Sequence, residues 1–383
     1  MLLTNAYPDF PSSYRGWFIK STAEVLKNAG YAVSVVTPKI YRKSHSVEDH
    51  GGINVFRFPF GAGDKLLIEH ERIPYVRMIL YFITGCFTTA YVVLKHRCSL
   101  IHAHWAIPTG LIGVWVGSLL GRPLVVTIHG SDFTMGTGRG SFLRKLFFYV
   151  CRKANVITCV SEGLRQAIEQ LGIPGEKIVV TPMGAEAVFF EVGKKRDKRS
   201  GEGPTVVLSN RNLQPLYNVL QLVRAIPWVL KDEPSTKFLI AGEGQERTAL
   251  EKEAEQLGIT PSIQFLGSVP HEKMADLLAK VDIYVSTSLS DGSSVSLLEA
   301  MASGAFPVVT DIPANREWIC DRKNGMLVAT RNEIALASGI VEAIRNKDLM
   351  TLAREENRSR VEQKAHPEQN REAFLRIYRS VAP

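Results

Sequence analysis

The stretch that decides the fold is residues 282–311, DIYVSTSLSDGSSVSLLEAMASGAFPVVTD. Its β-branched and aromatic start, residues 283–285, predicts a buried strand, and residues 307–309 predict the next one. Between them, the run SLLEAMA predicts a helix that ends at Gly304, a residue suited to the left-handed conformation that closes helices. A strand–loop–helix–strand unit places its loop at the carboxyl edge of a parallel sheet, where open α/β folds bind ligands.

Two carboxylates bracket this loop: Asp291 lies at its start, and Glu299 follows on the helix after seven intervening residues. The first N–H groups of a helix have no intrahelical partner, so a helix start suits an anion. The small residues Gly292, Ser293 and Ser294 allow close approach of a ligand to the backbone. Together these features predict a pocket for a molecule that carries phosphates and hydroxyls, with Glu299 accepting hydrogen bonds from a ribose.

The same stretch resembles the signature of retaining GT-B glycosyltransferases of glycosyltransferase family 4 (glycosyl transferases group 1). That family carries two glutamates with seven residues between them, followed by LLEAMA-x-G-x-PVV, and here Asp291 replaces the first glutamate. The resemblance implies that Asp291 contacts the donor sugar or its anomeric region, and that Glu299 binds the ribose. An ordinary amphipathic helix with a solvated Glu299 is the alternative. The implied donor contacts in this stretch are Gly292, Ser293, Ser294, Val295 and Glu299.

The chain of 383 residues is too long for one ordinary α/β core, which predicts two domains. The resemblance implies the GT-B architecture, an α/β fold of two Rossmann-like, doubly wound parallel-sheet domains facing a cleft. The charged, glycine-rich run 191–204 predicts the linker. We therefore expect an N-terminal acceptor-side domain at 1–190, a C-terminal nucleotide-sugar-binding domain at 205–365, and a C-terminal helix at 366–383 that crosses back to the first domain.

The net charge of +8 belongs to the first half of the chain. Residues 1–190 contain 20 Lys and Arg against 12 Asp and Glu, whereas residues 191–383 contain 26 of each kind. A basic surface suits nucleic acid, anionic lipid or an acidic substrate. No nucleic-acid-binding motif is present, so we expect an anionic membrane surface or an acidic substrate as partner, and no nucleic acid. Scattered cysteines and the lack of a secretory signal favour a reduced, cytoplasmic protein.

Two segments of the first half match the family at its site. The loop NAYPDFPSSYRG lies where the resemblance brings acceptor and donor together, which makes Ser13, Tyr14, Arg15 and Gly16 candidates for acceptor or phosphate contact. A plain loop between strand and helix is an equal alternative. In the segment TIHGSD, the resemblance implies that His129, at a strand end, bonds to hydroxyls of the donor sugar and orients the anomeric centre. The alternative is a lone histidine at the end of a strand.

The second half supplies the remaining donor candidates. Family members commonly carry an arginine after the first strand of this domain and a lysine six residues later, and both neutralise the donor diphosphate. Arg211 matches the arginine, whereas Tyr217 stands at the lysine position and removes one cation. The turn Gly242, Glu243, Gly244 at a strand's carboxyl end resembles the family's segment beside the nucleotide base.

Three further segments leave alternatives open. Residues 77–95 contain 17 consecutive uncharged residues, and we expect a buried helix rather than a membrane span. The basic and aromatic run 139–153 fits either an interfacial helix on anionic lipid or a core-facing helix. His102 and His104 lack a third ligand at metal-binding spacing, which favours a structural or acceptor-lining role.

The residues and the resemblance together predict a retaining, metal-independent glycosyltransferase of the hexosyltransferase type. It would move a sugar from a nucleoside diphosphate sugar to a glycan or lipid-linked acceptor, with no cofactor beyond that co-substrate. We expect it in the cytoplasm, peripheral on the inner face of the cell membrane. The alternatives are a nucleotide-sugar epimerase of GT-B fold and a degenerate sugar-nucleotide-binding protein.

Overall fold

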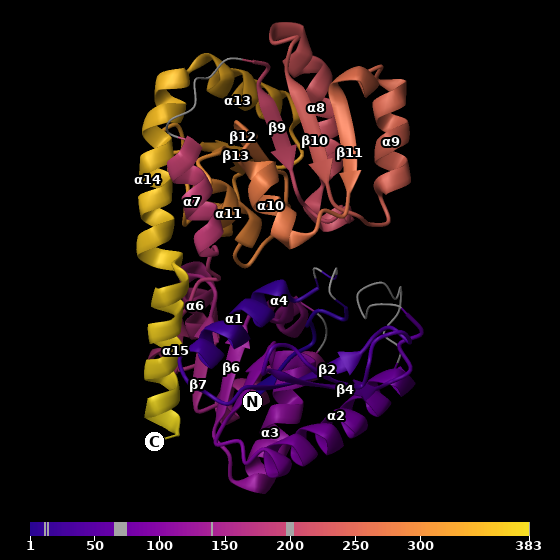
Figure 1. The fold of residues 1–383 in the computed structure, drawn as a ribbon, viewed down its shortest axis with the longest axis vertical. Coiled ribbons are helices and arrows are strands. Elements are labelled where there is room, and N and C mark those ends of the chain that lie inside the picture. The colour runs from indigo at the N-terminus through magenta and orange to yellow at the C-terminus, as the bar shows by residue number, and fades with distance from the viewer. Residues whose placement is uncertain (11–12, 14, 65–74, 139–140, 197–202, 383) are drawn as a thin grey trace. The chain divides into compact units, whose positions relative to one another are not determined.

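The computed structural model describes residues 1–10, 13, 15–64, 75–138, 141–196 and 203–382. It divides into two compact units (Figure 1). Unit 1 comprises Met1–Pro182 and Asn370–Pro383, and unit 2 comprises Met183–Gln369. Each unit is a sheet of mainly parallel strands with helices on both faces, so the expected fold class of two doubly wound α/β units is confirmed.

Within the described residues, unit 1 has an 8-stranded sheet of order β3-β4-β2-β1-β5-β6-β7-β8. All neighbouring strands are parallel except β3 and β4. The strands are β1 (Leu2–Leu3), β2 (Ser34–Lys39), β3 (Val47–Asp49), β4 (Asn54–Pro59), β5 (Ile101–His104), β6 (Leu124–Ile128), β7 (Val156–Cys159) and β8 (Ile178–Val180). The helical segments are α1 (Trp17–Asn28), α2 (Tyr75–Lys95), η2 (Ala106–Gly110), α3 (Leu111–Leu120), α4 (Ser131–Gly138), α5 (Ser141–Lys153), α6 (Glu162–Gln170), η3 (Gly175–Lys177) and α15 (Pro367–Val381).

Side chains alternate between the two faces of this sheet, so apolar runs such as that of β6 are buried on both sides. The register aligns Val55, Val35 and Leu2 in one row, and these residues pack in one cluster with Ile19 of α1 and Phe374 of α15. Helices α2 and α3 lie side by side and contact the sheet (Figure 1). The C-terminal helix thus belongs to the core of unit 1 from Asn370 onwards.

Helix α2 is the apolar run for which we expected burial, and that expectation is wrong for its outer side. Tyr81, Thr89 and Val92 are buried, but Val76 is 81% exposed and Phe87 is 74% exposed. The reason is that α2 covers the sheet with one side only, and no described element covers the other. By length and composition, Val76–Lys95 is the one helix among the described residues that could cross a membrane.

Helix α5 contains the described part of the basic and aromatic run, whose residues 139–140 lie outside the described residues. Phe147 and Val150 are buried, whereas Phe142 is 69% exposed and Tyr149 is exposed as well. The helix therefore has one core-facing side and one exposed side, and the interfacial reading of this run stays a prediction.

Unit 2 has, within its described residues, a 6-stranded parallel sheet of order β11-β10-β9-β12-β13-β14. The strands are β9 (Val206–Ser209), β10 (Lys237–Ala241), β11 (Ile263–Gly267), β12 (Ile283–Ser286), β13 (Phe306–Thr310) and β14 (Met326–Val328). Their helical segments are α7 (Ala187–Arg196), η4 (Pro215–Tyr217), α8 (Val219–Asp232), α9 (Arg247–Gln256), η5 (Thr260–Ser262), α10 (His271–Leu278), α11 (Val295–Ala302), α12 (Pro313–Arg316), α13 (Glu333–Arg345) and α14 (Lys347–Ala365). Successive residues of one strand enter different cores, as Val207 and Leu208 do.

The boundary between the units differs from the expected one. Residues 187–196, expected in the acceptor-side domain and the linker, form α7, which contacts α10, α11 and α14 of unit 2. Phe189 and Phe190 anchor it in the core there. The charge of its C-terminal turn suggested a linker, but Arg196 bonds to Asp282 over 2.7 Å. Residues 197–202 of the expected linker lie outside the described residues.

Candidate functional site

The deciding stretch folds as predicted, with β12 leading through a loop into α11 and then β13. Ser294 is the N-cap of α11, and its hydroxyl accepts a hydrogen bond from the N–H of Leu297 over 3.3 Å. Asp291 accepts a hydrogen bond from the N–H of Gly292, which holds the loop before the helix start. Gly304 follows the helix with a φ of 78°. The anion-attracting helix start therefore lies where the pattern indicated.

Arg211 forms the centre of a polar cluster at this helix start. Its Nη2 donates to Asp291 Oδ2 over 2.6 Å. Its Nη1 donates to the hydroxyls of Ser294 and Ser296 over 2.8 Å each. The side chains of Arg211 and Asp291 are only 10% and 17% exposed. Burial is the largest single influence on the pKa of Arg211 and acts to lower it, but Asp291, together with Tyr284 and Tyr217, raises the pKa overall, so the guanidinium is charged.

Two atoms of this cluster keep unused hydrogen-bonding capacity. Among the described residues, Arg211 Nε and Ser293 Oγ are buried and have no hydrogen-bond partner. Buried polar groups are normally satisfied, so such atoms in one cluster indicate a place for a bound polar ligand.

Tyr217 stands where the family commonly has a lysine, and its ring lies over the guanidinium of Arg211. The guanidinium carbon of Arg211 is 4.4 Å from the centre of the Tyr217 ring, a cation–π contact. Its backbone carbonyl accepts a hydrogen bond from Thr287 Oγ1 over 2.9 Å, which ties η4 to the loop after β12. In this departure from the family pattern, an aromatic ring packed against Arg211 therefore replaces the lysine, the second cation.

The turn at Gly242, Glu243 and Gly244 lies against the loop that carries Arg211. A Cβ at Gly242 would lie 2.3 Å from the carbonyl oxygen of Arg211, and one at Gly244 would lie 2.2 Å from that of Leu213. Larger residues would push the two loops apart, so the glycines serve close backbone approach. The Glu243 carboxylate accepts a hydrogen bond from Arg247 Nη1 over 2.5 Å.

Glu299 has a partner that the sequence did not suggest. The side chain of this residue is buried, and its Oε1 lies 2.9 Å from Nε2 of His271, the first residue of α10. Burial raises the pKa of Glu299, although His271 opposes the effect. Burial also acts to lower the pKa of His271, but the hydrogen bond and charge of Glu299 raise it overall. Both pKa shifts favour the protonated forms, so the His271–Glu299 pair keeps its protons to a higher pH than the two groups would in water.

Unit 1 places His129 at the end of β6, in a stack of rings. Its ring centre is 4.4 Å from that of Trp105 and 5.3 Å from that of His104. His104 Nδ1 and His129 Nε2 lie 3.1 Å apart, so one of the nitrogens donates to the other. Burial lowers the pKa of His129 to about 3, which makes it neutral at physiological pH. The backbone N–H of His129 donates a hydrogen bond to the Asp132 carboxylate, which holds the end of the strand.

His102 and His104 are fully buried and structural in their contacts. His102 Nδ1 lies 2.6 Å from the Tyr378 hydroxyl of α15, and its Nε2 lies 2.6 Å from Thr127 Oγ1. In the described part of the chain, no group of three or more His, Cys, Asp or Glu residues could hold a metal ion.

The described residues of the acceptor-side loop contact one another. Arg15 donates to both carboxylate oxygens of Asp9, over 2.6 and 2.9 Å, and to the Asn5 carbonyl over 2.5 Å. Its charge is therefore compensated by Asp9, as that of Arg211 is by Asp291. Gly16 has a φ of 68°, and a Cβ there would lie 2.3 Å from the backbone of Ala6. Ser13 is buried beside them, and Tyr14 lies outside the described residues.

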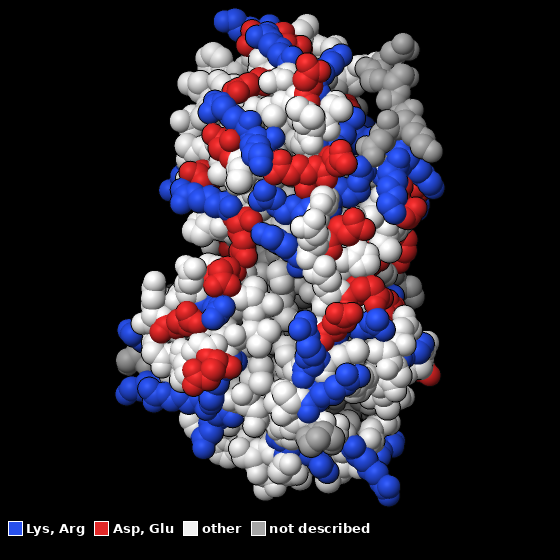
Figure 2. Space-filling model, turned by 90° about the vertical axis from the view of Figure 1, so that its left-hand side faces the viewer, with Lys and Arg blue, Asp and Glu red and all other residues white. Residues whose placement is uncertain are grey.

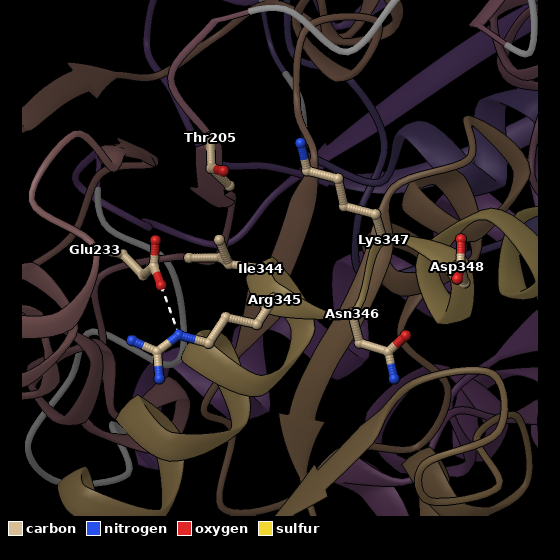
Figure 3. A pocket seen from close by; sticks show the side chains of 7 residues that line it. All are labelled: Thr205, Glu233, Ile344, Arg345, Asn346, Lys347 and Asp348. Carbon is tan, nitrogen blue, oxygen red and sulfur yellow. Dashed lines mark hydrogen bonds and ion pairs between the residues drawn. The ribbon is translucent and has the colours of Figure 1, made fainter.

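A cavity of about 450 Å³ in unit 2 lies away from this site (Figure 3). It opens between Thr205, just before β9, and the junction of α13 and α14, whereas Arg211 follows β9 at its other end. The one guanidinium in its lining, that of Arg345, donates to Glu233 over 2.8 Å. The cavity therefore belongs to the amino-terminal edge of the sheet and not to the ligand-binding edge.

Pattern reasoning missed three contributors to the site: His271, Ser296 and His104. His271 follows Pro270 at the start of a helix after β11, so its position at the carboxyl edge of the sheet was the available signal. Ser296 is inside the family-like run, where its distance from Arg211 could not be read. For His104 the sequence favours a structural or acceptor-lining role, but its contact with His129 could not be predicted.

Two doubly wound parallel-sheet units, one with a cation held at a helix start, define the GT-B class. Residues 16–184 match the family model of the glycosyl transferase 4-like domain, and residues 193–365 match that of the glycosyl transferases group 1. The chain belongs to the glycosyl transferases group 1 family.

Individual relatives are distant but span most of the chain. Alpha-monoglucosyldiacylglycerol synthase of Streptococcus pneumoniae is 26% identical over 344 residues, which cover 82% of this chain and 75% of the relative. Sucrose-phosphate synthase of Thermosynechococcus elongatus matches with a TM-score of 0.80 at 18% identity, over 99% and 98% of the two chains. HepE of Anabaena, solved in complex with UDP-glucose, matches with a TM-score of 0.76 at 17% identity, over 99% of both chains. These structures support the GT-B fold.

Proposed function

We propose that the chain transfers a sugar from a nucleoside diphosphate sugar to a glycan or lipid-linked acceptor, with retention and without a metal ion. The observation that carries the proposal is the cluster of Arg211, Asp291, Ser294 and Ser296 at the start of α11. It offers a fixed cation, hydroxyl groups and unpaired helical N–H groups to a diphosphate, with the buried Glu299 on the same helix for the ribose. The UDP-glucose complex of HepE supports this donor class.

The chemistry assigned to these groups is electrostatic. The acceptor oxygen attacks the anomeric carbon on the face from which the diphosphate leaves, the bond from that carbon to the phosphate oxygen breaks, and the acceptor proton passes to the leaving diphosphate. Arg211 and the N–H groups of α11 stabilise the charge that develops on the diphosphate. The carboxylate of Asp291 holds sugar hydroxyls.

Incubation with UDP-, GDP- and ADP-sugars, with and without acceptor, tests the proposal. Transfer requires acceptor and gives a product whose anomeric proton, seen by NMR, reports retention; turnover is expected to continue in EDTA. Conversion of the donor without acceptor would show the epimerase instead. Nucleotide binding without any turnover would show a degenerate binding protein.

Glu299→Gln tests the ribose contact. A neutral amide of nearly the same shape keeps the packing but loses the charge-assisted hydrogen bonds, so nucleotide affinity is expected to fall by roughly 10- to 100-fold. Isothermal titration with the nucleoside diphosphate measures it. His271→Leu is the control for the partner: it removes the contact to Glu299 but not the proposed ribose acceptor, and a smaller loss is expected. Unchanged affinity in Glu299→Gln would refute the assignment.

Tyr217→Lys tests the missing cation. Because Asp291 already compensates Arg211, the cluster carries no net charge, and a lysine at this position adds one positive charge beside the diphosphate. The affinity for a nucleoside diphosphate is expected to rise by about tenfold, the value of one charge-assisted hydrogen bond. Tyr217→Phe keeps the ring over Arg211 and is expected to bind as the wild type does. Weaker binding in Tyr217→Lys would show that the ring, and not the charge, is what the donor requires.

A further inference from the structure

Helices α2 and α3 present a continuous apolar surface, here named the α2–α3 face. Its side chains are large, apolar and between 44% and 81% exposed. They are Val76, Ile79, Leu80, Ile83, Phe87, Tyr91 and Leu94 of α2, with Trp115 and Leu119 of α3. Single exposed apolar residues need no explanation, but a contiguous patch marks an interaction site.

The patch is continuous for two reasons. On α2 the exposed residues recur at intervals of three and four, with Ile79 and Leu80 adjacent, which places them in one stripe along the helix. The stripe continues onto α3, since the two helices are in contact and the Phe82 and Trp115 rings meet edge to face with centres 5.9 Å apart.

The structure argues that α2 lies along a surface and does not cross one. The side of α2 that carries Tyr81, Thr89 and Val92 is buried, and the helix contacts β2 and β4. Crossing a bilayer would strip this side from the sheet. A helix with one apolar exposed side lies in the plane of a membrane interface, with that side about 5–10 Å deep.

The charges around α2 and α3 identify the kind of surface that the α2–α3 face binds. From Arg72 to Ser131 the sequence contains no Asp or Glu. The cations in the described part of that stretch lie at the helix ends and just beyond, with Arg77 near the start of α2, Lys95 and Arg97 at its end, and Arg122 after α3. On the face of the molecule drawn in Figure 2, by contrast, positive and negative side chains are interspersed. An apolar stripe with cationic ends and no acids matches a bilayer of anionic lipid.

We propose that the α2–α3 face docks unit 1 on an anionic lipid bilayer, with its apolar side chains in the interface and its terminal cations on the headgroups. A second copy of this chain fits less well, because pairing two such faces would bring like charges together without an acidic partner. The inference deepens the proposed function by favouring a lipid-linked acceptor. Its test uses neither donor nor acceptor, so its failure is distinguishable from failure of the transferase proposal.

Vesicle flotation of the full chain tests the docking. Wild type is expected to float with vesicles of phosphatidylcholine and phosphatidylglycerol at low salt, and less with phosphatidylcholine alone or at 1 M salt, where the Debye length is about 3 Å. The triple variant Ile83→Gln, Phe87→Gln, Leu94→Gln keeps good helix formers at exposed positions. It is expected to need about tenfold more lipid, or more, for half-binding.

The matched control removes the same number of exposed apolar side chains from helices of unit 2. Trp228→Gln, Ile334→Gln and Leu352→Gln together are expected to float like wild type. Circular dichroism and thermal unfolding verify the fold of both triple variants. As a positional readout, vesicles are expected to shift tryptophan emission to the blue, and Trp115→Phe to remove most of that shift.

Three results would overturn the proposal. Wild type could fail to float with anionic vesicles at low salt, or the α2–α3 variant could float as wild type does. In the third, sedimentation would show a wild-type dimer that the variant abolishes, without flotation, which would assign the face to a second copy of the chain.

Discussion

Arg211→Met is expected to destabilise unit 2 by about 3 kcal/mol and to weaken nucleoside diphosphate binding by at least tenfold. The stability loss arises because Asp291, whose side chain is only 17% exposed, keeps its charge but loses the guanidinium at 2.6 Å. The affinity loss arises because the proposed diphosphate site loses its cation. Hydrogen exchange in α11 measures the first effect, and calorimetric titration measures the second.

A second variant separates the two effects. In Arg211→Met combined with Asp291→Asn no unpaired charge remains, so most of the stability is expected to return, whereas the nucleotide affinity is not. Arg224→Gln is the matched control, because it breaks an arginine–carboxylate pair of the same unit whose arginine is 48% exposed. Exposed pairs of this kind contribute less than about 1 kcal/mol. Recovery of both properties in the double variant would show that Arg211 serves the fold alone.

The sequence predicted the architecture because its strongest signals are local. Residues 282–311 combine a β-branched run, a helix-forming run and a glycine at the right spacing, and each part folds as its own pattern indicates. Parallel strands then bring their carboxyl ends to one edge, which placed Asp291 near the loop of Arg211 without any knowledge of distance.

Features that depend on contacts between residues distant in the sequence could not be predicted from local patterns. The exposure of α2 depends on whether another layer covers its outer side, and its apolar composition is compatible with both a buried and an exposed helix. Residues 187–196 carry the charge of a linker, but Phe189 and Phe190 find a core in unit 2. Arg15 has the residue type of a phosphate ligand, and its hydrogen bonds to Asp9 become visible only in the fold.

The pairing of His271 with Glu299 shows the same limit. The two residues are 28 positions apart on separate helices, and no periodicity relates them. What sequence could establish is that both lie after parallel strands, β11 and β12. Contact between their side chains follows from the packing of α10 and α11 in one core.

Unit 1 is expected to lose stability in acid because of His104. Its side chain is fully buried, and burial, with His102 and His129 as lesser causes, holds its pKa well below the ordinary 6.5. Below pH 6.5 the unfolded chain therefore binds a proton at this residue that the folded chain does not. The resulting stability is present above pH 6.5 and is lost as pH falls, by about 1.4 kcal/mol per pH unit.

His104→Phe isolates this contribution, because neighbours also titrate: burial raises the pKa of Asp132 to about 6 and lowers that of His102 to about 3. Phenylalanine keeps a ring in the stack and takes up no proton, but it removes the hydrogen bond between His104 Nδ1 and His129 Nε2. Hydrogen exchange in β5 between pH 7.5 and 4.5 is therefore expected to show a variant that is less stable at pH 7.5 and whose stability falls less steeply in acid. The surface control His45→Gln is expected to follow wild type. Parallel curves for His104→Phe and wild type would mean that His104 can accept a proton in the folded state, through water reaching the stack from the side of the partly exposed His129.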